Sequence, residues 1–421
     1  TGGAGDDVLI SDTSRGLSDA TGSDFTSAVY RDATGPITVT LSSEGSVVGD
    51  VSVGTDTLIG IDRVFGSEFD DTFTVDSEFS GTFGTFNEIE GGGGDDLIAG
   101  NGNTRVGYLH ADAGVFVDLD AGTASSIEGD DAAGIGTDTF TDVNQVRGSQ
   151  HGDTLVGGDG EGFESFRGQA GDDFIDGGGG LEDRADYKNS PNPVHVDLSS
   201  GIALDGFGGA DTLVNIERVR GSELGDLLIG SDIGNRLEGK DGDDTLIGGE
   251  GDDSLRGDGG DDTLSSGSGR DFLTGGSGSD AFVFTSKDGS TRNLPGDTGS
   301  YADIISDYTA GEDRIVFEGM EGISYTGRVF EMVNGSPFGS TEDAIDADPS
   351  IQNEIVFILE TGSDQSDTGI RGHLYVKGAG TGVDFDQMHI MLDDVSVPPP
   401  VDALVFSDPD AIISGDVAAS L

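Results

Sequence analysis

The chain of 421 residues contains no cysteine, and only 20 of its residues are basic against 81 acidic ones. The missing cysteines exclude disulfide cross-links, but they fit exported and cytosolic proteins equally well. The shortage of basic residues gives a formal net charge of -61. This charge excludes nucleic acid and anionic membrane surfaces as partners, because both would repel the chain. No apolar run approaches the roughly 20 residues of a transmembrane helix, so we expect no membrane insertion.

No N-terminal signal peptide is recognisable, and the chain begins inside a repeat, GGAGDD at residues 2–7. We therefore expect a mature fragment or an excised piece of a longer protein. Glycine is the abundant residue, with 74 copies. So much glycine and aspartate is typical of disorder, but 33% of the residues are hydrophobic and recur at fixed offsets. That regularity favours a folded repeat protein.

The clearest repeat is a nonapeptide that occurs seven times without a gap over residues 221–283, from GSELGDLLI to GGSGSDAFV. An apolar side chain occupies position eight of every copy, and aspartate or asparagine occupies position six. Five isolated copies begin earlier, at Gly2, Gly66, Gly91, Gly148 and Gly168. The position-six residues of all twelve copies are Asp7, Asp71, Asp96, Asp153, Asp173, Asp226, Asn235, Asp244, Asp253, Asp262, Asp271 and Asp280.

A second repeat of about 78 residues fills the first half of the chain. Tyr30, Tyr108 and Tyr187 lie 78 and 79 residues apart, and an alternating strand follows each of them, at residues 37–41, 115–119 and 194–198. Next comes a Gly-x-Asp-Thr segment that leads directly into a nonapeptide. Its aspartates are Asp56, Asp138 and Asp211. For these we leave turn capping and metal ligation open, and we expect the tyrosines to be packing residues. The alternation of period two predicts β-strands rather than helices.

The nonapeptide can be divided into six residues of turn and three of strand. Glycines in the turn permit positive φ and close approach of two backbones, so that carbonyl oxygens can point at one centre beside the position-six carboxylate. Such hard oxygen ligands select Ca²⁺, six to eight per ion, and suit Mg²⁺ less well. We therefore predict Ca²⁺, several ions, at the position-six residues and at the turn glycines Gly239, Gly248, Gly257 and Gly275.

Two nonapeptides would form one coil of 18 residues, with parallel strands stacked about 4.8 Å apart. The predicted carboxylate pairs are Asp226/Asp244, Asp244/Asp262, Asp262/Asp280, Asn235/Asp253 and Asp253/Asp271. Because Asn235 carries no charge, its site should be weaker. Seven buried position-eight side chains form a thin core. We therefore expect a disordered calcium-free state and cooperative folding when calcium is added.

These nonapeptides resemble those of the RTX (repeats-in-toxin) family, the calcium-binding β-roll of bacterial exoproteins. The resemblance implies a right-handed parallel β-roll, export through a type I secretion channel, and folding outside the cell. Residues 301–317 resemble the cap that follows the β-roll in serralysin-type proteases and alginate-epimerase R-modules, and residues 388–392 are similar to its close. We predict an all-β chain with long repeats at 1–220, a β-roll at 221–283, a cap at 284–395 and a proline-led acidic tail at 396–421.

No catalytic motif stands out. The five histidines are scattered and no His-Glu-x-x-His occurs, there is no Gly-x-Ser-x-Gly elbow, and the carboxylates are too numerous to single out an acid–base pair. We therefore predict a secreted or cell-surface calcium-binding module without catalysis of its own. Two alternatives stay open: the non-catalytic C-terminal portion of a secreted protease, lipase or polysaccharide epimerase, or an adhesin, surface-layer or matrix subunit. In the latter case its partners would be copies of itself or a cell-surface polysaccharide.

Overall fold

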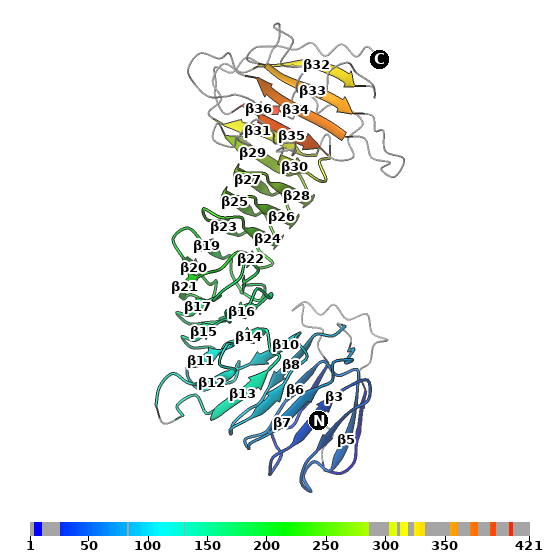
Figure 1. Ribbon diagram of the computed structural model, residues 1–421, viewed down its shortest axis with the longest axis vertical. Helices are drawn as coiled ribbons and strands as arrows, with labels where there is room; N and C mark the ends of the chain where they lie inside the picture. The colour runs from blue at the N-terminus through cyan, green and yellow to red at the C-terminus, as the bar shows by residue number, and fades with distance from the viewer. Residues whose placement is uncertain are drawn as a thin grey trace. The chain divides into compact units, whose positions relative to one another are not determined.

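The computed structural model describes residues 4–10, 26–81, 84–129, 131–285, 303–309, 312–318, 324–332, 354–360, 371–377, 388–392 and 404–406. All regular elements in these ranges are β-strands, as predicted (Figure 1). No helix among the described residues could cross a membrane. The chain divides into two compact units, Thr1–Asn192 with Ser200–Val219, and Pro193–Ser199 with Arg220–Leu421.

In the first unit the chain passes alternately through two sheets, which we call the first sheet and the second sheet (Figure 1). Successive coils stack on one another, which is the geometry of a β-solenoid. In the second sheet each strand is parallel to the next. Its members in order are β2 (Ser27–Val29), β6 (Arg63–Phe65), β8 (Asn87–Glu90), β10 (Thr104–Gly107), β14 (Gln145–Arg147), β16 (Ser165–Arg167) and β18 (Arg184–Asp186).

In the first sheet the long repeats differ from the nonapeptides. Each long repeat inserts an antiparallel meander into it, β3–β4–β5 in the first repeat and β11–β12–β13 in the second. The nonapeptide strands then continue the sheet in parallel. The members are β1 (Val8–Ile10), β3 (Thr38–Leu41), β4 (Gly45–Val48), β5 (Thr55–Ile59), β7 (Thr72–Val75), β9 (Leu97–Ala99), β11 (Val115–Asp118), β12 (Thr123–Ser126), β13 (Thr137–Thr141), β15 (Thr154–Val156), β17 (Phe174–Asp176), β20 (Ile202–Leu204) and β21 (Ala210–Val214).

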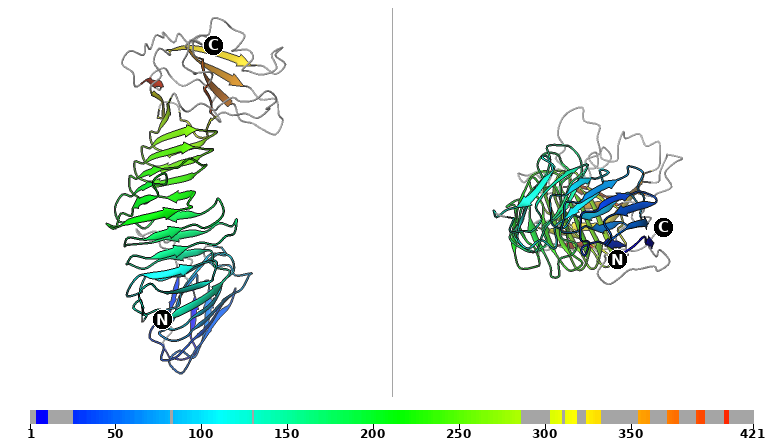
Figure 2. Two further views of the ribbon diagram at one scale, coloured as in Figure 1. Left: turned by 60° about the vertical axis from the view of Figure 1, so that its left-hand side comes forward. Right: turned by 90° about the horizontal axis from the view of Figure 1, so that it is seen from below.

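The second unit contains a parallel β-roll with the predicted 18-residue coil (Figure 2). Leu228 pairs with Leu246, Leu246 with Leu264 and, on the opposite side, Leu237 with Leu255. All seven position-eight side chains are 0% exposed, which confirms the predicted core. The strands are β19 (His195–Asp197), β23 (Leu227–Ile229), β24 (Arg236–Asp241), β25 (Thr245–Glu250), β26 (Ser254–Gly259), β27 (Thr263–Ser268), β28 (Phe272–Ser277) and β29 (Ala281–Thr285), with β22 (Arg218–Arg220) where the two units join in sequence.

Strands β24 to β28 are six residues long rather than the predicted three. The extra residues belong to the first half of the following turn, where the backbones of successive coils continue to pair, as Gly249 does with Gly267 and Glu250 with Ser268. Glycine-rich turns one coil apart thus stack with the same parallel register as the strands. This stacking brings the position-six residues of neighbouring coils together.

Beyond the β-roll, β30 (Asp303–Ile305) pairs with β28 and β31 (Arg314–Glu318) with β29. Further strands are β32 (Ser324–Met332), β33 (Glu354–Glu360), β34 (Arg371–Lys377), β35 (Met388–Leu392) and β36 (Leu404–Phe406). Strands β33, β34 and β35 are antiparallel. Most of the predicted tail, residues 396–403 and 407–421, lies outside the described residues.

The second sheet of the first unit carries a buried ionic network on its strands β6, β8, β10 and β14. Glu88 is 0% exposed and forms ion pairs with Arg63, with Arg105 at 3.3 Å and with Arg147 at 3.3 Å. Burial alone would raise the pKa of Glu88, but Arg105, Arg63 and Arg147 together lower it to about 2. Arginines of three other strands in this sheet therefore satisfy the buried Glu88 carboxylate.

Candidate metal centre

The predicted metal-ligating residues are buried at the turns that precede the strands. Apart from Asp7, which is half-buried, each of the twelve is at most 4% exposed. In the β-roll the predicted pairs lie one coil apart, since the strands that follow them pair in register. The structure therefore brings together every carboxylate pair predicted from the sequence.

Hydrogen bonds link these residues into rows, which we call carboxylate ladders. The backbone N–H of Asp226 donates to Oδ1 of Asp244 at 2.7 Å, Asp244 donates to Asp262 at 2.9 Å, and Asp262 to Asp280 at 3.0 Å. The same relation joins the residues on the opposite side and in the first unit. These further ladders are Asn235–Asp253–Asp271–Asp303, Asp71–Asp96–Asp138, Asp153–Asp173–Asp211 and Asp7–Asp56.

The ladder bond uses only Oδ1, and the second carboxylate oxygen has a different environment. Ladder members whose Oδ2 is buried and accepts no hydrogen bond from the described part of the chain include Asp7, Asp96, Asp173, Asp244, Asp253 and Asp262. We call a ladder position of this kind an open rung. A buried carboxylate oxygen without a donor is strongly destabilising unless a cation or a proton reaches it.

The acidities of the open rungs reflect this environment. Burial, followed by the charge of Asp138, raises the pKa of Asp96 to about 9. Burial and Asp211 raise that of Asp173 to about 9 in the same way. Burial is also the main cause that raises the pKa of Asp244 and Asp253 to about 8 and that of Asp262 to about 7. Stacked carboxylates of this kind favour a proton or a cation, and a metal ion would supply the missing positive charge.

The glycine at position one of the nonapeptide makes space for Oδ2. A Cβ on Gly257 would lie 1.9 Å from Oδ2 of Asp262 and 2.5 Å from the carbonyl oxygen of Gly275. The same carboxylate approach occurs at Gly239, Gly248 and Gly275, where the distances to Oδ2 of Asp244, Asp253 and Asp280 are 2.0, 2.4 and 2.1 Å. A carboxylate oxygen and, at Gly257, a backbone carbonyl oxygen therefore converge at a place that a larger residue would fill.

The turns before the open rungs also share a strained backbone. In the turns before Asp96, Asp173, Asp244, Asp253 and Asp262, positions two and four have positive φ, as at Gly249 (112°) and Gly251 (103°). Residues other than glycine adopt this conformation at position two of three such turns, with φ of 81° at Gln169, 98° at Lys240 and 79° at Asp258. Non-glycine residues rarely occupy this region, and their strain is typical of functional turns.

This geometry also identifies ladder members that the nonapeptide search missed. Asp138 follows Gly134 and Gly136, both with positive φ (68° and 67°), so residues 133–138 form a turn of the same class although position one is alanine. Asp303 and Asp313 extend two ladders beyond the tandem repeats. A search for Gly-x-Gly-x-Asp without a fixed first glycine would have found Asp138. The other two lack that signal.

Both carboxylate oxygens of Asp56 and of Asp211 accept hydrogen bonds in the structure. The hydroxyl groups of Tyr30 and Tyr187 donate to their Oδ2 atoms at 3.0 Å, while Oδ1 accepts the N–H of Asp7 or Asp173. Burial and the nearby carboxylates raise the pKa of Tyr187 well above its ordinary value. The tyrosines are buried, as predicted, and each also satisfies a ladder carboxylate.

The oxygen set fits a calcium ion. Carboxylate and carbonyl oxygens are hard ligands of the kind that Ca²⁺ prefers. Among the residues that the structure describes, no three histidine, aspartate or glutamate side chains gather in a metal-binding group. An ion in the ladders would therefore be held by one or two carboxylates together with backbone carbonyls of the stacked turns.

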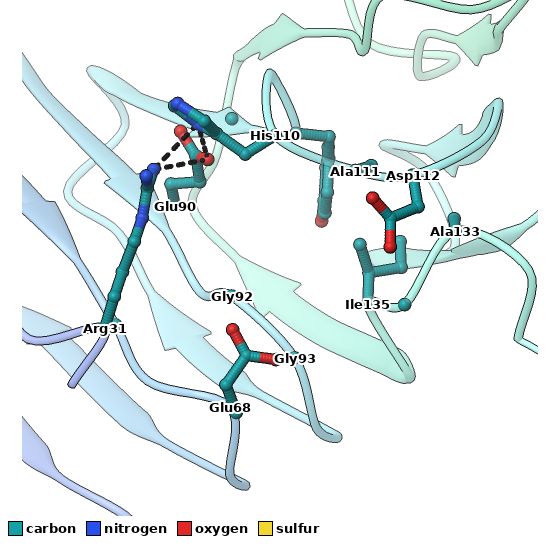
Figure 3. Close-up of a pocket in the computed structure, with 14 residues that line it drawn as sticks. Arg31, Glu68, Glu90, Gly92, Gly93, His110, Ala111, Asp112, Ala133 and Ile135 are labelled. Carbon is teal, nitrogen blue, oxygen red and sulfur yellow. Dashed lines mark hydrogen bonds and ion pairs between the residues drawn. The ribbon is translucent and has the colours of Figure 1, made fainter. Parts of the chain in front are cut away.

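The first unit also contains a polar cavity of about 250 Å³ (Figure 3). On one side Arg31 donates to Oε1 of Glu90 at 3.2 Å, and His110 contacts the same oxygen. Figure 3 shows Glu68 and Asp112 elsewhere on the lining, away from this cluster. The turn residues Gly92, Gly93 and Gly134 line it as well, so the cavity lies beside the Asp96–Asp138 ladder.

Comparison with known proteins agrees with the nonapeptide analysis. The family model of the RTX calcium-binding nonapeptide repeat (4 copies) matches residues 160–180, 229–264 and 256–283. No curated protein matches the chain.

Several solved structures resemble parts of the chain. Two are AlgE6R2 and AlgE6R3, subunits of an Azotobacter vinelandii mannuronan C5-epimerase, both at 24% identity. The matches cover 44% and 47% of this chain and 95% and 88% of those chains, with TM-scores of 0.27 and 0.22. The extracellular lipase LipA of Serratia marcescens is similar at 18% identity over 62% of this chain and 39% of its own, with a TM-score of 0.23.

Proposed function

The chain carries RTX calcium-binding nonapeptide repeats, and we propose that it is an extracellular module that folds on Ca²⁺ after type I secretion. Its role is structural, at the cell surface or in export, without catalysis of its own. The observation that carries this proposal is the set of open rungs. Buried carboxylates stacked one coil apart, with Oδ2 lacking a donor, leave a charge that a divalent cation would neutralise.

The thin core of the β-roll makes that neutralisation decisive for folding. Each coil buries two position-eight side chains, such as Leu246 and Leu255, and each contributes roughly 1.5–3 kcal/mol. Ordering the backbone opposes folding by about 1–2 kcal/mol per residue. Bound calcium would add stability to the folded state alone, by about 2.7 kcal/mol per site at 100 times the dissociation constant. A calcium-poor cytoplasm would therefore keep the β-roll unfolded for export.

Circular dichroism and size-exclusion chromatography of the full chain, in metal-free buffer and with Ca²⁺, test this proposal. We expect a gain of β-structure and a smaller hydrodynamic radius with Ca²⁺, and a weaker response to Mg²⁺ at equal concentration. An unchanged spectrum and radius after complete removal of calcium would contradict calcium-dependent folding.

Assembly at the cell surface is a second candidate, favoured by the meanders of the long repeats. An export module needs only the nonapeptides and a cap, whereas the third long repeat leaves Ile202 and Leu204 52% and 51% exposed on β20. Exposed apolar side chains suit contacts between copies. Electron microscopy with calcium would show ordered polymers if the chain assembles and monomers if it serves as an export module.

The absence of catalysis is tested separately. Arg31 and His110 in the polar cavity are both engaged by Glu90, which favours a structural role for that cluster. We expect no protease, lipase or polysaccharide epimerase activity from this chain, as for the non-catalytic portion of a secreted enzyme. Turnover that persists after the ladder aspartates are replaced would refute this part of the proposal.

A further inference from the structure

Four ladder members differ from the open rungs because a serine at position two satisfies their side chains. The backbone N–H and the hydroxyl of Ser222 donate to the two oxygens of Asp226 at 2.6 and 2.8 Å. Ser149 does the same for Asp153 at 2.6 and 2.7 Å, and Ser67 for Asp71 at 2.7 and 2.9 Å. Ser231 donates both of its groups to Oδ1 of Asn235 at 2.6 and 3.0 Å. We call these four positions capped rungs.

The backbone of a capped rung belongs to another class. None of the four serines has a positive φ, and position four is phenylalanine, histidine, leucine or isoleucine instead of a glycine with positive φ. Serine can cap only in this conformation, because its N–H and hydroxyl must both face the carboxylate. The residue at position two therefore determines whether the side chain at position six accepts hydrogen bonds from two donors or whether its Oδ2 has no donor.

The neighbouring coil gives an independent reason for the difference. Oδ1 of Asp71, Asp153 and Asp226 accepts the N–H of Ile37, Val115 and Val194, respectively, at 2.7–2.8 Å. These three donors begin the alternating strands of the long repeats. The residues before them are not Gly-x-Gly-x-Asp turns, so no second carboxylate lies one coil earlier. These capped rungs thus stand at the start of their ladders, where a strand N–H takes the place of the N–H from an earlier turn.

We infer that the serine caps replace the metal at Asp71, Asp153, Asp226 and Asn235, so that each of these ladders binds calcium only beyond its first rung. This inference deepens the proposed function, because it rests on calcium binding at the open rungs. N–H and O–H donors give a carboxylate the positive partial charges that a cation would otherwise provide. The ladders then begin to bind calcium at Asp96, Asp173, Asp244 and Asp253.

The test is to count calcium ions bound to the full chain by native mass spectrometry, supported by calorimetric titration. The double variant Ser222→Gly/Leu224→Gly converts the turn before Asp226 to the sequence class of the open rungs and leaves the carboxylate in place. We expect one additional calcium ion per chain. The control Asn235→Asp adds a charge at a rung that remains capped by Ser231, and we expect its calcium count to equal that of the wild type.

The reverse variant, Gly249→Ser/Gly251→Ile, places a cap before Asp253 within a ladder. We expect it to lose at least one calcium ion while the first unit keeps its structure. An unchanged count in both double variants, or a gain in Asn235→Asp alone, would overturn the inference. If the Ser222 variant does not fold, Asn235→Asp and the reverse variant still decide the question. A wild-type chain that binds no calcium would instead refute the proposed function.

Discussion

Replacing Asp262 by asparagine should have opposite effects on stability with and without calcium. Asp262 is an open rung that belongs to two adjacent pairs, with Asp244 and with Asp280. Without calcium, burial and then the charges of Asp280 and Asp243 disfavour its ionised form. A neutral amide keeps an oxygen that can accept the N–H of Asp244 and removes that repulsion. We therefore expect the calcium-free variant to contain as much β-structure as the calcium-free wild type, or slightly more.

With calcium the same substitution removes a charged ligand from the two pairs. Losing one site that is filled at 100 times its dissociation constant lowers stability by about 2.7 kcal/mol, and losing two by about 5 kcal/mol. In a unit of this size the smaller value corresponds to a fall in Tm of roughly 5–11 °C. Thermal unfolding followed by circular dichroism, in saturating calcium and at a calcium concentration just sufficient to fold the wild-type β-roll, compares the loss of Tm under two conditions.

Asp226→Asn is the matched control, since Ser222 caps that rung and its oxygens already have donors. We expect a loss of about 1–2 kcal/mol, from weakened hydrogen bonds, that is the same at both calcium concentrations. The reasoning would be refuted if Asp262→Asn lowered Tm equally under both conditions. It would also fail if Asp226→Asn lost as much calcium-dependent stability as Asp262→Asn.

Three further results are expected. In metal-free buffer the β-structure of the β-roll should increase as the pH falls from 9 to 5, because the folded state raises the pKa of Asp244 and Asp253 to about 8 and that of Asp262 to about 7. The stability that these protonated carboxyl groups contribute is complete below their ordinary pKa near 4 and is lost as the pH rises through 7–8. Circular dichroism that shows less β-structure at pH 5 than at pH 9 would contradict this prediction. Glu88→Gln should destabilise the first unit by about 3–5 kcal/mol, because three arginines lose their shared buried partner, and chemical denaturation should give the same loss with and without calcium. Leu255→Ala should cost about 2–5 kcal/mol, measured in saturating calcium, and a loss below 1 kcal/mol would mean that the core does not limit stability.

The repeat architecture could be predicted because it depends on spacing alone. An apolar residue at position eight of each nonapeptide predicts an 18-residue coil, and Leu246 does pair with Leu228 and Leu264. The strands of the long repeats were also visible as period-two alternation. What the sequence did not reveal is that β3 and β5, or β11 and β13, flank an antiparallel strand. Alternation marks a strand but does not indicate its direction or its neighbours.

The candidate site was predicted at the level of residue type and not at the level of each rung. Position six is equally acidic at Asp226 and Asp244, so composition alone treats them alike. Their difference arises from position two, where Ser222 donates twice and Lys240 adopts a φ of 98°. Lysine at a positive φ is unfavourable in isolation, and only the stacked turns of neighbouring coils can maintain it. Such a feature follows from tertiary structure, and no local propensity predicts it.

The chain satisfies its buried carboxylates in several ways, and these differ in their dependence on metal. Glu88 is neutralised by arginines, Asp211 accepts a tyrosine hydroxyl, and Asp153 is capped by serine. Each of these partners is built into the sequence and acts at any calcium concentration. Asp244 and Asp262 have no such donor for Oδ2 among the described residues. The dependence of folding on calcium should therefore follow the distribution of hydrogen-bond donors along the chain rather than the number of acidic residues. It should be strongest in the β-roll and weakest in coils of the first unit that are joined by arginine and glutamate. Hydrogen exchange in metal-free buffer would then protect β8 and β10 while β25 and β27 exchange freely, and equal protection of the two pairs would contradict this division.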